Sequence, residues 1–412
     1  MNAMCGIVGY TGNAVSQRPL EVVLSGLSRL EYRGYDSAGV ALNSPGREVP
    51  TVVKRTGKLA VLREALEENP PAPASSAIGH TRWATHGEPS EINSHPQVSE
   101  DGSLALVHNG IIENAGELAE ELRREGAHLR SETDTEVVAF LLARAMREAD
   151  ADDEAGRLVQ AMLQVTRRLV GTYTLLAIAG GAPRTIVAAR RSSPLVIGLG
   201  EGENYLGSDA LAFADHTTHA LEVDQDQVVL VTPETVTVMN QDGVPVQPRE
   251  LNVDFLRDRA HKDGWPTFME KEIHEQPRAI FDTLAGRLDS SGRLTLDEVR
   301  IPEDVLRRAD KMVVVACGTA AYAGQVARYA IEHWCRIPVE VELAHEFRYR
   351  DPIVNEKTLV IAISQSGETM DTIMAIRHAR EQGAKVIAIV NTPGSTIARE
   401  SDAVLLTHAG PE

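Results

Sequence analysis

Apolar positions in the first 240 residues follow two patterns. Brief apolar runs are typical of strands, whereas apolar residues at every third or fourth position predict helices. From residue 185 to 239 the runs shorten and alternate, as in an antiparallel sheet. We therefore expect one sheet-rich α+β domain. Its expected strands are 7–10, 39–42, 51–55, 77–80, 104–108 and 172–179, and its expected helices are 20–30, 117–125, 135–149 and 157–169.

Two segments interrupt these patterns. The proline-rich stretch 69–76 is expected to hold neither a helix nor a central strand, because proline lacks the N–H that both require. Residues 242–265 carry turn residues and charge without a sustained period, which indicates an interdomain linker. We expect a first domain at 5–240, a linker at 241–267 and a second domain at 268–412.

After the linker, apolar runs alternate with helical patterns of 10 to 15 residues. This alternation predicts βαβ units and an α/β fold with a doubly wound parallel sheet. The two halves of the chain are therefore expected to be different folds. The expected strands are 311–316, 339–342, 358–363, 385–390 and 403–406, and the expected helices are 268–287, 320–334 and 371–382.

The composition of the chain argues against two classes of binding partner, nucleic acids and membranes. Lys and Arg total 41 and Asp and Glu 59, so the net charge is −18, which disfavours nucleic acids and anionic membranes. The apolar runs are far shorter than the roughly 20 residues that a membrane span requires. Three cysteines are too few for a disulfide framework and indicate a reducing cytoplasm. We expect a cytoplasmic protein with no nucleic-acid or membrane partner.

The first candidate for chemistry is Cys5, in the stretch M-C-G-I-V-G. If Met4 is the initiator and is removed, Cys5 gains a free α-amine with a pKa of about 7.7–8.0. Such an amine acts as a general base near neutral pH, so a terminal cysteine carries its own base. Met1, Asn2 and Ala3 precede Met4 in the sequence. If they stay attached, Cys5 has an amide nitrogen and no base.

Four polar stretches in the same half offer partners for Cys5. Asn109 and Gly110 end an expected strand, and their N–H groups suit an oxyanion hole. Asp134 lies in S-E-T-D-T-E, which would serve as a helix-capping box. Alternatively, Asp134 would bind the ammonium group of an amino-acid ligand, and Arg82 would bind the carboxylate of the same ligand. His80 and His86 flank Arg82 in H-T-R-W-A-T-H-G, but two histidines alone do not make a zinc site. The loop Y-R-G-Y-D-S-A-G reads as a turn with an Arg–Asp pair.

In the second half, the run L-V-I-A-I leads into S-Q-S-G-E-T before a helix. Hydroxyls, a glycine and free N–H groups at a helix N-terminus form a phosphate cradle, although helix capping alone would explain part of the pattern. The stretch A-C-G-T repeats this arrangement after the preceding strand, and Cys317 within it reads as a small core residue. Neither stretch is a dinucleotide-binding fingerprint.

Taken together and in order, these stretches resemble the glutamine–fructose-6-phosphate aminotransferase family, also called glucosamine-6-phosphate synthase. The motifs that carry the resemblance are C-G-I-V-G, E-Y-R-G-Y-D-S-A-G, H-T-R-W-A-T-H-G-E-P, H-N-G-I-I-E-N and S-E-T-D-T-E, with S-Q-S-G-E-T in the second half. The resemblance covers nearly the whole chain from Met4. It implies an N-terminal-nucleophile glutaminase domain, of the class II glutamine amidotransferase type, followed by a sugar-isomerase domain.

The resemblance also assigns residues to roles. Cys5 matches the nucleophile, and Asn109 and Gly110 match the oxyanion hole. Ala320 stands where the family usually has a serine, so the sugar site lacks one hydroxyl. The glutamine-binding residues match Arg33, Arg82, Trp83, Thr85, His86 and Asp134, and the sugar-phosphate-binding residues match Thr319, Ser364, Gln365, Ser366 and Thr369.

The implied reaction converts L-glutamine and D-fructose 6-phosphate into D-glucosamine 6-phosphate and L-glutamate, the first step of amino-sugar synthesis. It implies no metal, nucleotide or organic cofactor, and a homodimer for the full-length protein. Because T-H-A-G-P-E matches the point before the family's next sugar-binding segment, we expect the chain to lack the family's C-terminal sugar-isomerase domain and to support at most the glutaminase half.

Two other functions remain open from the residues. One is another N-terminal-cysteine amidotransferase, which would make phosphoribosylamine or asparagine. The second is a non-enzymatic regulator that binds a sugar phosphate. The S-Q-S-G-E-T loop after a βαβ strand argues against the first, and the glutaminase motifs argue against the second, since a sensor needs no nucleophile.

Overall fold

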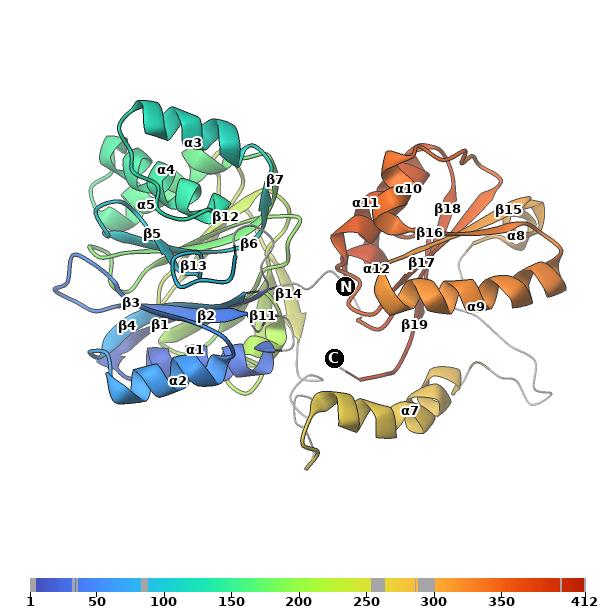
Figure 1. Cartoon of the computed structure of the whole chain (residues 1–412), viewed down its shortest axis with the longest axis horizontal. Coiled ribbons are helices and arrows are strands. Elements are labelled where there is room, and N and C mark those ends of the chain that lie inside the picture. Colours follow the sequence, from blue (N-terminus) through green and yellow to red (C-terminus); the bar gives the residue numbers. More distant parts are fainter. Residues whose placement is uncertain are drawn as a thin grey trace. The chain divides into compact units, whose positions relative to one another are not determined.

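The computed structural model describes residues 5–31, 34, 36–82, 88–252, 264–285, 287, 301–392 and 395–410. The chain divides into two compact units, one within Ala3–Asp258 and the other within Arg259–Glu412 (Figure 1). Each unit has its own sheets and its own buried core.

The first unit contains two antiparallel sheets. The larger has eight strands in the order β14-β11-β9-β10-β1-β4-β2-β3, and the smaller has six in the order β13-β12-β8-β7-β6-β5. The larger sheet is built from β1 (Gly6–Ser16), β2 (Ser37–Asn43), β3 (Thr51–Thr56), β4 (Ala74–Arg82), β9 (Val196–Leu199), β10 (Glu203–Gly207), β11 (His219–Glu222) and β14 (Arg249–Asn252). The smaller is built from β5 (Gln97–Val98), β6 (Leu104–Ile112), β7 (Gly171–Ala179), β8 (Ile186–Arg191), β12 (Gln227–Val231) and β13 (Val236–Met239).

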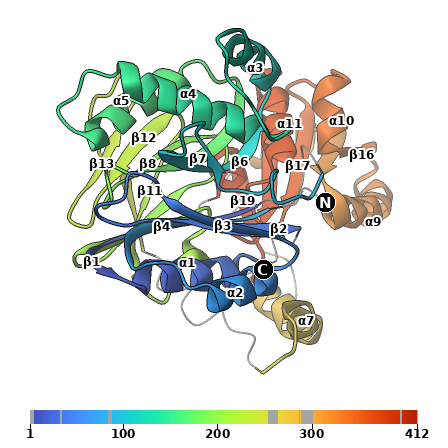
Figure 2. The same ribbon diagram turned by 60° about the vertical axis from the view of Figure 1, so that its left-hand side comes forward.

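Helices cover the outer face of each sheet in this unit, which gives four layers (Figures 1 and 2). Against the larger sheet lie α1 (Arg18–Arg29) and α2 (Leu59–Glu68), and against the smaller lie α3 (Ala115–Arg124), α4 (Asp134–Glu148) and α5 (Glu154–Thr166). One short 3-10 helix, η2 (Ala210–Ala212), packs beside α1.

The strand β6 shows why the layers form. Leu104 and Leu106 point into the core beneath the helices, whereas Ala105 and Val107 point into the core between the two sheets. Because side chains alternate across a strand, one apolar run fills two cores at once. The prediction of antiparallel sheets with helices is therefore confirmed for this unit.

The prediction for the proline-rich stretch is wrong in its last three residues. Strand β4 begins at Ala74 and lies between β1 and β2, in the interior of the larger sheet. The last proline of the stretch is Pro73, so every residue from Ala74 onward has an N–H for the sheet. The hydroxyls of Ser75 and Ser76 both donate to the carbonyl oxygen of Pro183, which makes these polar residues compatible with burial.

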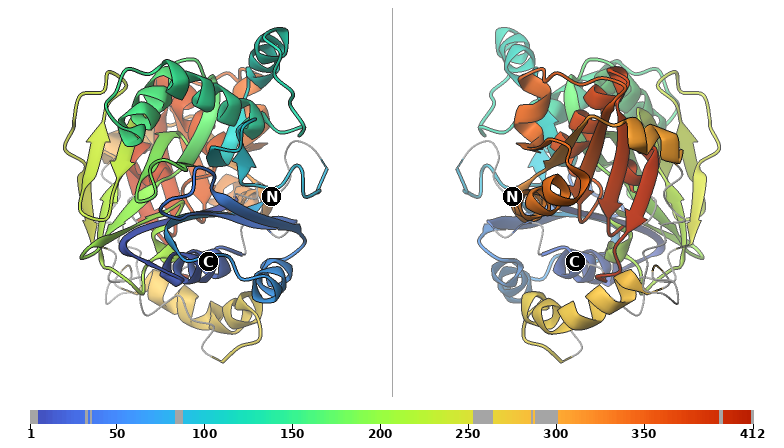
Figure 3. Two further views of the ribbon diagram at one scale, coloured as in Figure 1. Left: turned by 90° about the vertical axis from the view of Figure 1, so that its left-hand side faces the viewer. Right: turned by 90° about the vertical axis from the view of Figure 1, so that its right-hand side faces the viewer.

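The second unit is a parallel sheet of five strands in the order β16-β15-β17-β18-β19 (Figures 1 and 3). Its elements follow the helix α7 (Phe268–Leu284). They are α8 (Glu303–Arg308), β15 (Lys311–Ala316), α9 (Gly318–Cys335), β16 (Val339–Leu343), α10 (Ala344–Tyr349), β17 (Thr358–Ser364), α11 (Met370–Glu381), β18 (Lys385–Val390), α12 (Thr396–Glu400) and β19 (Ala403–Leu406).

Both faces of this sheet are covered. Val360 and Ala362 of β17 pack with α10, α11 and α12, whereas Leu359 and Ile361 of the same strand pack with α8 on the opposite face. Helix α9 also lies on that opposite face, where Gly324 contacts Val314. The prediction of a doubly wound α/β fold is therefore confirmed.

The order of the strands defines where a ligand would bind in the second unit. From β15 the chain crosses through α9 to β16, whereas from β17 it crosses through α11 to β18, on the other face and in the other direction. The crevice outside the carboxyl ends of β15 and β17 is therefore the topological switch point, which is the usual ligand position in open α/β sheets.

Several short elements were not predicted from the sequence. They include α8, α10 and α12, each of five or six residues, and β14, which pairs with β11 and lies within the expected linker. One or two helical turns contain too few residues for a period to be visible. The ten-residue helix α2 was also not predicted. Among the described helices, none is both long enough and apolar enough to cross a membrane.

Candidate active site and phosphate loop

The predicted nucleophile and the predicted oxyanion residue are neighbours in the structure. Cys5 directly precedes β1, and Asn109 lies near the end of β6, 104 residues away in sequence. The side-chain Nδ2 of Asn109 donates a hydrogen bond of 2.6 Å to the carbonyl oxygen of Cys5. The amide of Asn109 therefore presents its N–H side toward Cys5 and its oxygen away from it.

A buried histidine holds the amide of Asn109 in this orientation. Nε2 of His80 lies 3.0 Å from Oδ1 of Asn109 and 3.1 Å from the carbonyl oxygen of His108. Because both of these oxygens are acceptors, Nε2 of His80 carries the proton and donates. His80 lies on β4 and pairs with Ile7 of β1, so the strand next to the nucleophile supplies this donor.

Burial keeps this histidine neutral. His80 is fully buried and His95 is 7% exposed. Desolvation lowers the pKa of His80 to about 3 and that of His95 well below its ordinary value. The two rings pack with their centroids 4.3 Å apart. A neutral His80 with its proton on Nε2 is thus the stable form at physiological pH, and it fixes which way Asn109 points.

This arrangement predicts the effect of two substitutions at position 80. His80→Leu removes the donor and leaves Oδ1 of Asn109 unpaired, so we expect kcat for glutamine hydrolysis to fall on the order of tenfold, less than for loss of Asn109 itself. His80→Gln places an amide nitrogen near the former Nε2 and should restore most of the activity. Steady-state kinetics of both variants checks this, and equal losses in both would contradict the positioning role.

The same histidine contributes to acid sensitivity. Its pKa is about 3 in the folded protein, below the ordinary value of 6.5, so the unfolded chain binds its proton first as the pH falls. The contribution of His80 to stability is present above pH 6.5 and is lost as the pH falls toward 3. His80→Gln should therefore show a flatter dependence of its thermal midpoint on pH in this window.

Gly110, the second predicted oxyanion residue, has a backbone that requires glycine. Its φ is +131°, and a Cβ there would overlap the carbonyl oxygen of Thr172 on β7. The next residue, Ile111, donates its N–H to the hydroxyl of Thr172 at 3.3 Å. The end of β6 is thus held close against β7 immediately after Asn109.

Asp134 lies beside the same end of β6. Its Oδ2 accepts a hydrogen bond of 2.8 Å from the backbone N–H of Ile112, and its Oδ1 lies 3.7 Å from Nδ1 of His108. The N-cap of α4 is instead Thr133, whose hydroxyl accepts from the N–H of Glu136. Helix capping therefore does not use the carboxylate of Asp134, which faces the strand that carries Asn109 and Gly110.

Arg82 is the last residue of β4 and is 4% exposed. It lies two residues after His80, so both side chains lie on the same face of the strand. The carbonyl oxygen of Arg82 accepts a hydrogen bond of 3.1 Å from the N–H of Asp36. The other predicted glutamine-binding residues, Arg33, Trp83, Thr85 and His86, lie outside the described residues.

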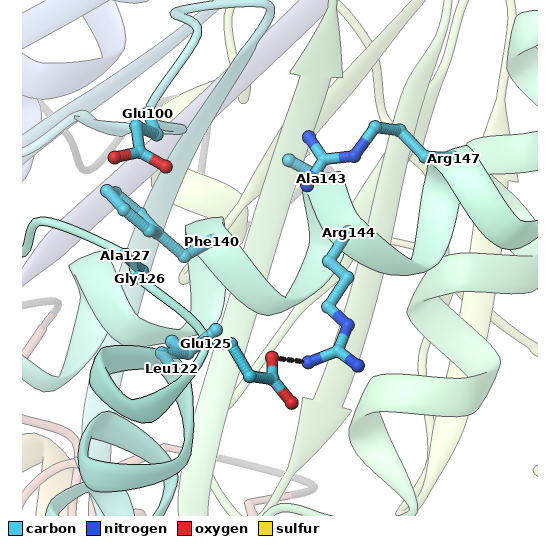
Figure 4. A pocket seen from close by; sticks show the side chains of 9 residues that line it. All are labelled: Glu100, Leu122, Glu125, Gly126, Ala127, Phe140, Ala143, Arg144 and Arg147. Atoms are coloured by element: carbon cyan, nitrogen blue, oxygen red, sulfur yellow. Dashed lines mark hydrogen bonds and ion pairs between the residues drawn. The ribbon is translucent and has the colours of Figure 1, made fainter.

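A small cleft elsewhere in this unit contains none of the predicted residues among its described lining (Figure 4). It has a volume of about 130 Å³ and lies beside the end of α3 and along α4. Arg144 pairs with Glu125 and with Glu148, and Arg147 lies 3.7 Å from Asp101, so carboxylates balance both cations. The lining consists of Glu100, Leu122, Glu125, Gly126, Ala127, Phe140, Ala143, Arg144 and Arg147.

The predicted phosphate loop lies in the second unit, between β17 and α11. The hydroxyl of Ser364 accepts from the N–H of Gly367 and lies 3.1 Å from the hydroxyl of Thr369, and the hydroxyl of Ser366 accepts from the N–H of Glu368. The loop is therefore folded over its own hydroxyls. Gly367 has φ +66°, and a Cβ there would overlap the hydroxyl of Ser395.

The remaining sugar-site residues lie at the same edge of the sheet. Thr369 is the N-cap of α11, yet its side chain makes no capping hydrogen bond, and Thr319 is exposed in the first turn of α9. The backbone oxygen of Gln365 accepts from the N–H of Asn391. The loops after β15 and β17 thus present hydroxyl groups at the topological switch point, where a phosphate would meet two helix N-termini.

Two families of domain match this chain. Residues 71–244 match the model of the glutamine amidotransferase domain, and residues 305–412 match the model of the SIS domain. The first match includes His80, Arg82, Asn109, Gly110 and Asp134. The second includes all the predicted sugar-phosphate residues.

Curated relatives match nearly the whole chain. It is 59% identical over 413 residues to the glutamine–fructose-6-phosphate aminotransferase [isomerizing] of Corynebacterium efficiens and 59% identical over 409 residues to that of Streptomyces coelicolor. Each match covers 99% of this chain and 65% of the relative, so the chain spans about two thirds of the length of these relatives. A solved C-terminal domain of the Francisella tularensis enzyme is 40% identical over 37% of this chain and 42% of that chain, with a TM-score of 0.35.

One expectation from the sequence is wrong. We expected the chain to lack the C-terminal sugar-isomerase domain of the family. Residues 305–412 match the SIS domain model, and the matches to the relatives cover 99% of the chain. The chain therefore carries both a glutamine amidotransferase match and a sugar-isomerase match.

Proposed function

We propose that this chain releases ammonia from L-glutamine and binds D-fructose 6-phosphate, as parts of the reaction that forms D-glucosamine 6-phosphate and L-glutamate. The observation that carries the proposal is the hydrogen bond of 2.6 Å from the Asn109 amide to the carbonyl of Cys5. This contact supports the proposal because it brings an N–H donor close to the residue that is predicted to be the nucleophile. The glutaminase part would comprise residues 5–240 and the sugar-binding part residues 268–412, joined by residues 241–267.

In the proposed mechanism the thiolate of Cys5 attacks the carboxamide carbon of glutamine. The α-amine of Cys5, freed when the preceding residues are removed, accepts the thiol proton and passes it to the departing nitrogen. The N–H groups of Asn109 and Gly110 stabilise the oxyanion of the tetrahedral intermediate. Ammonia leaves, water hydrolyses the γ-glutamyl thioester, and glutamate is released.

The glutamine would be held by charge at both ends of its amino-acid group. Asp134 would take the ammonium group and Arg82 the carboxylate, with Arg33, Trp83, Thr85 and His86 as further contacts. Support comes from the position of the Asp134 carboxylate, 2.8 Å from the N–H of Ile112 and thus beside the oxyanion end of β6.

In the second unit, Thr319, Ser364, Gln365, Ser366 and Thr369 would bind the phosphate of fructose 6-phosphate. Hydroxyls and helix N-termini would provide hydrogen-bond donors without a full positive charge. These local donors would hold the phosphate against the repulsion of a chain of net charge −18. The ammonia would then react with the sugar carbonyl.

We also propose that the full-length protein is a cytoplasmic homodimer that binds no nucleic acid and needs no cofactor. The three cysteines are free thiols, as in a reducing compartment. Tyr322, Val326 and Tyr329 are exposed on one face of α9 at helical spacing and form an apolar stripe that a second subunit would cover.

The proposed reaction is distinguished from the other amidotransferase reactions by the molecule that accepts the ammonia, so the test measures which acceptor the chain binds. With glutamine labelled at the amide, we expect release of labelled ammonia and glutamate. By calorimetry we expect binding of fructose 6-phosphate but not of phosphoribosyl pyrophosphate or aspartate. The double variant Ser364→Ala/Thr369→Val should lose on the order of tenfold in affinity for the sugar phosphate, because each hydroxyl bonds a charged group.

A matched control is Ser401→Ala, whose hydroxyl donates to the carbonyl of Ile397 at the end of α12. It should leave sugar-phosphate affinity unchanged. Preference for phosphoribosyl pyrophosphate or aspartate would instead support another amidotransferase. Sugar-phosphate binding without any glutamate release would support a regulator.

A further inference from the structure

Three adjacent strands of the second unit each deliver a metal-ligating side chain to the same edge of the sheet. Cys317 directly follows β15 and is the N-cap of α9, His345 is the second residue of α10 after β16, and Asp371 is the second residue of α11 after β17. The strands β16, β15 and β17 are neighbours in the sheet. The sequence positions span 54 residues, so only the fold brings the three side chains together.

The three donor atoms converge. The thiol sulfur of Cys317, a ring nitrogen of His345 and a carboxylate oxygen of Asp371 all lie within 4.8 Å of one another. A tetrahedral zinc ion with bonds of about 2.0–2.3 Å holds its ligand atoms about 3.3–3.8 Å apart. The donor atoms must therefore approach one another by about one ångström. The side chain of His345 is 47% exposed, so it can rotate toward the other two ligands.

We propose that Cys317, His345 and Asp371 form a binding site for Zn²⁺, with water in the fourth position. A thiolate and an imidazole select a thiophilic ion such as zinc over Mg²⁺ or Ca²⁺, which prefer oxygen ligands. Three protein ligands and one open position are the arrangement of zinc sites that are not purely structural.

Binding of zinc at this site would release one proton, from the thiol of Cys317. Cys317 is a free cysteine, and its thiol carries one proton before a metal binds. Binding of Zn²⁺ forms the sulfur–zinc bond and releases that proton to solvent. Glu346 lies 3.9 Å from Nε2 of His345 and adds negative charge next to the ligand set.

The proposed zinc site lies next to the residues that are proposed to bind the phosphate. Cys317 lies two residues before Thr319, and Asp371 lies two residues after Thr369. A zinc ion would tie together the first turns of α9, α10 and α11 at the topological switch point. The proposal of the metal site itself does not depend on the proposed function, since its test measures no turnover.

The test uses cobalt as a spectroscopic substitute for zinc. The chain has three cysteines, so in the variant Cys5→Ala/Cys335→Ser the only thiol is that of Cys317. Titration of this full-length variant with Co²⁺ should give a thiolate-to-cobalt charge-transfer band that saturates at one ion per chain. Zn²⁺ should then abolish the band by displacement.

Adding His345→Asn or Asp371→Asn to that variant should weaken Co²⁺ binding at least tenfold. Adding Cys317→Ser should remove the band entirely. His333→Asn, an exposed histidine on α9, is the matched control and should change nothing. Far-UV circular dichroism shows that each variant is folded.

Zn²⁺ should also raise the thermal midpoint of the Cys5→Ala/Cys335→Ser variant, because a ligand that binds only the folded state stabilises it. Absence of the thiolate band in this variant would overturn the proposal. Binding that is unchanged by both the His345 and the Asp371 substitutions would overturn it equally.

Discussion

Replacing Cys5 by alanine is expected to reduce glutamine hydrolysis on the order of 10⁴-fold or more. The thiolate is the group that forms the covalent γ-glutamyl intermediate, and no side chain can take its place when it is removed. Asn109 lies 2.6 Å from the carbonyl of Cys5, so its donor would still be present but would have no tetrahedral intermediate to stabilise. The measurement is the rate of glutamate formation at saturating glutamine.

The control for this prediction is Cys335→Ser, which changes an exposed thiol on α9 and should leave glutamate formation at the parent rate. Cys5→Ala should also keep its affinity for fructose 6-phosphate, because Cys5 and the phosphate loop belong to different compact units. An unchanged rate of hydrolysis in Cys5→Ala would show that the nucleophile is another residue.

Asn109→Ala is expected to lower kcat for glutamine hydrolysis by about 10²–10³-fold, which corresponds to about 2.7–4 kcal/mol of transition-state stabilisation. The amide donor acts on charge that develops only in the transition state, so KM should change much less than kcat. The proton on Nε2 of His80 keeps its bond to the carbonyl of His108, so the substitution leaves no donor unpaired.

Asn114→Ala is the matched control, since this asparagine binds the backbone of Arg168 and Val170 at the start of α3. It should leave kcat unchanged. If Asn109→Ala raised KM and kept kcat, Asn109 would be a glutamine-binding residue and the oxyanion role would be wrong.

Most of the longer helices and strands of both units could be predicted, because the periodic pattern of apolar residues repeats over many positions. The strand 104–108 and the helix 135–149 were expected, and the structure has β6 at Leu104–Ile112 and α4 at Asp134–Glu148. The sequence did not show which part of the protein each face of a strand or helix packs against. The alternation of Leu104 and Ala105 between two cores becomes visible only when both sheets are placed.

The sequence predicted the residues proposed to act on glutamine. It did not predict the residue that orients them. Cys5 and Asn109 were predicted as partners through family motifs, and the structure brings them into contact. His80 was considered only as a metal ligand, because nothing in H-T-R-W-A-T-H-G indicates a contact with a residue 29 positions later. The available signal was a histidine directly after the apolar residues 77–79, because a buried polar side chain needs a hydrogen-bond partner.

The three proposed zinc ligands could not be grouped from the sequence either. Cys317 was interpreted as a small core residue, and it does pack against the core of the second unit. His345 and Asp371 have no metal-ligand spacing relative to it in the sequence. Only the order of β16, β15 and β17 places the three at one edge, which no local pattern predicts.

The most direct test of the account is a measurement of the intact mass of the protein together with its glutamine hydrolysis, with and without fructose 6-phosphate. We expect protein that begins at Cys5 to hydrolyse glutamine and protein that retains the preceding residues not to do so, because only the former has the α-amine as a base. A mature Cys5 terminus with no hydrolysis in either condition would show that this chain is not a glutaminase with Cys5 as its nucleophile.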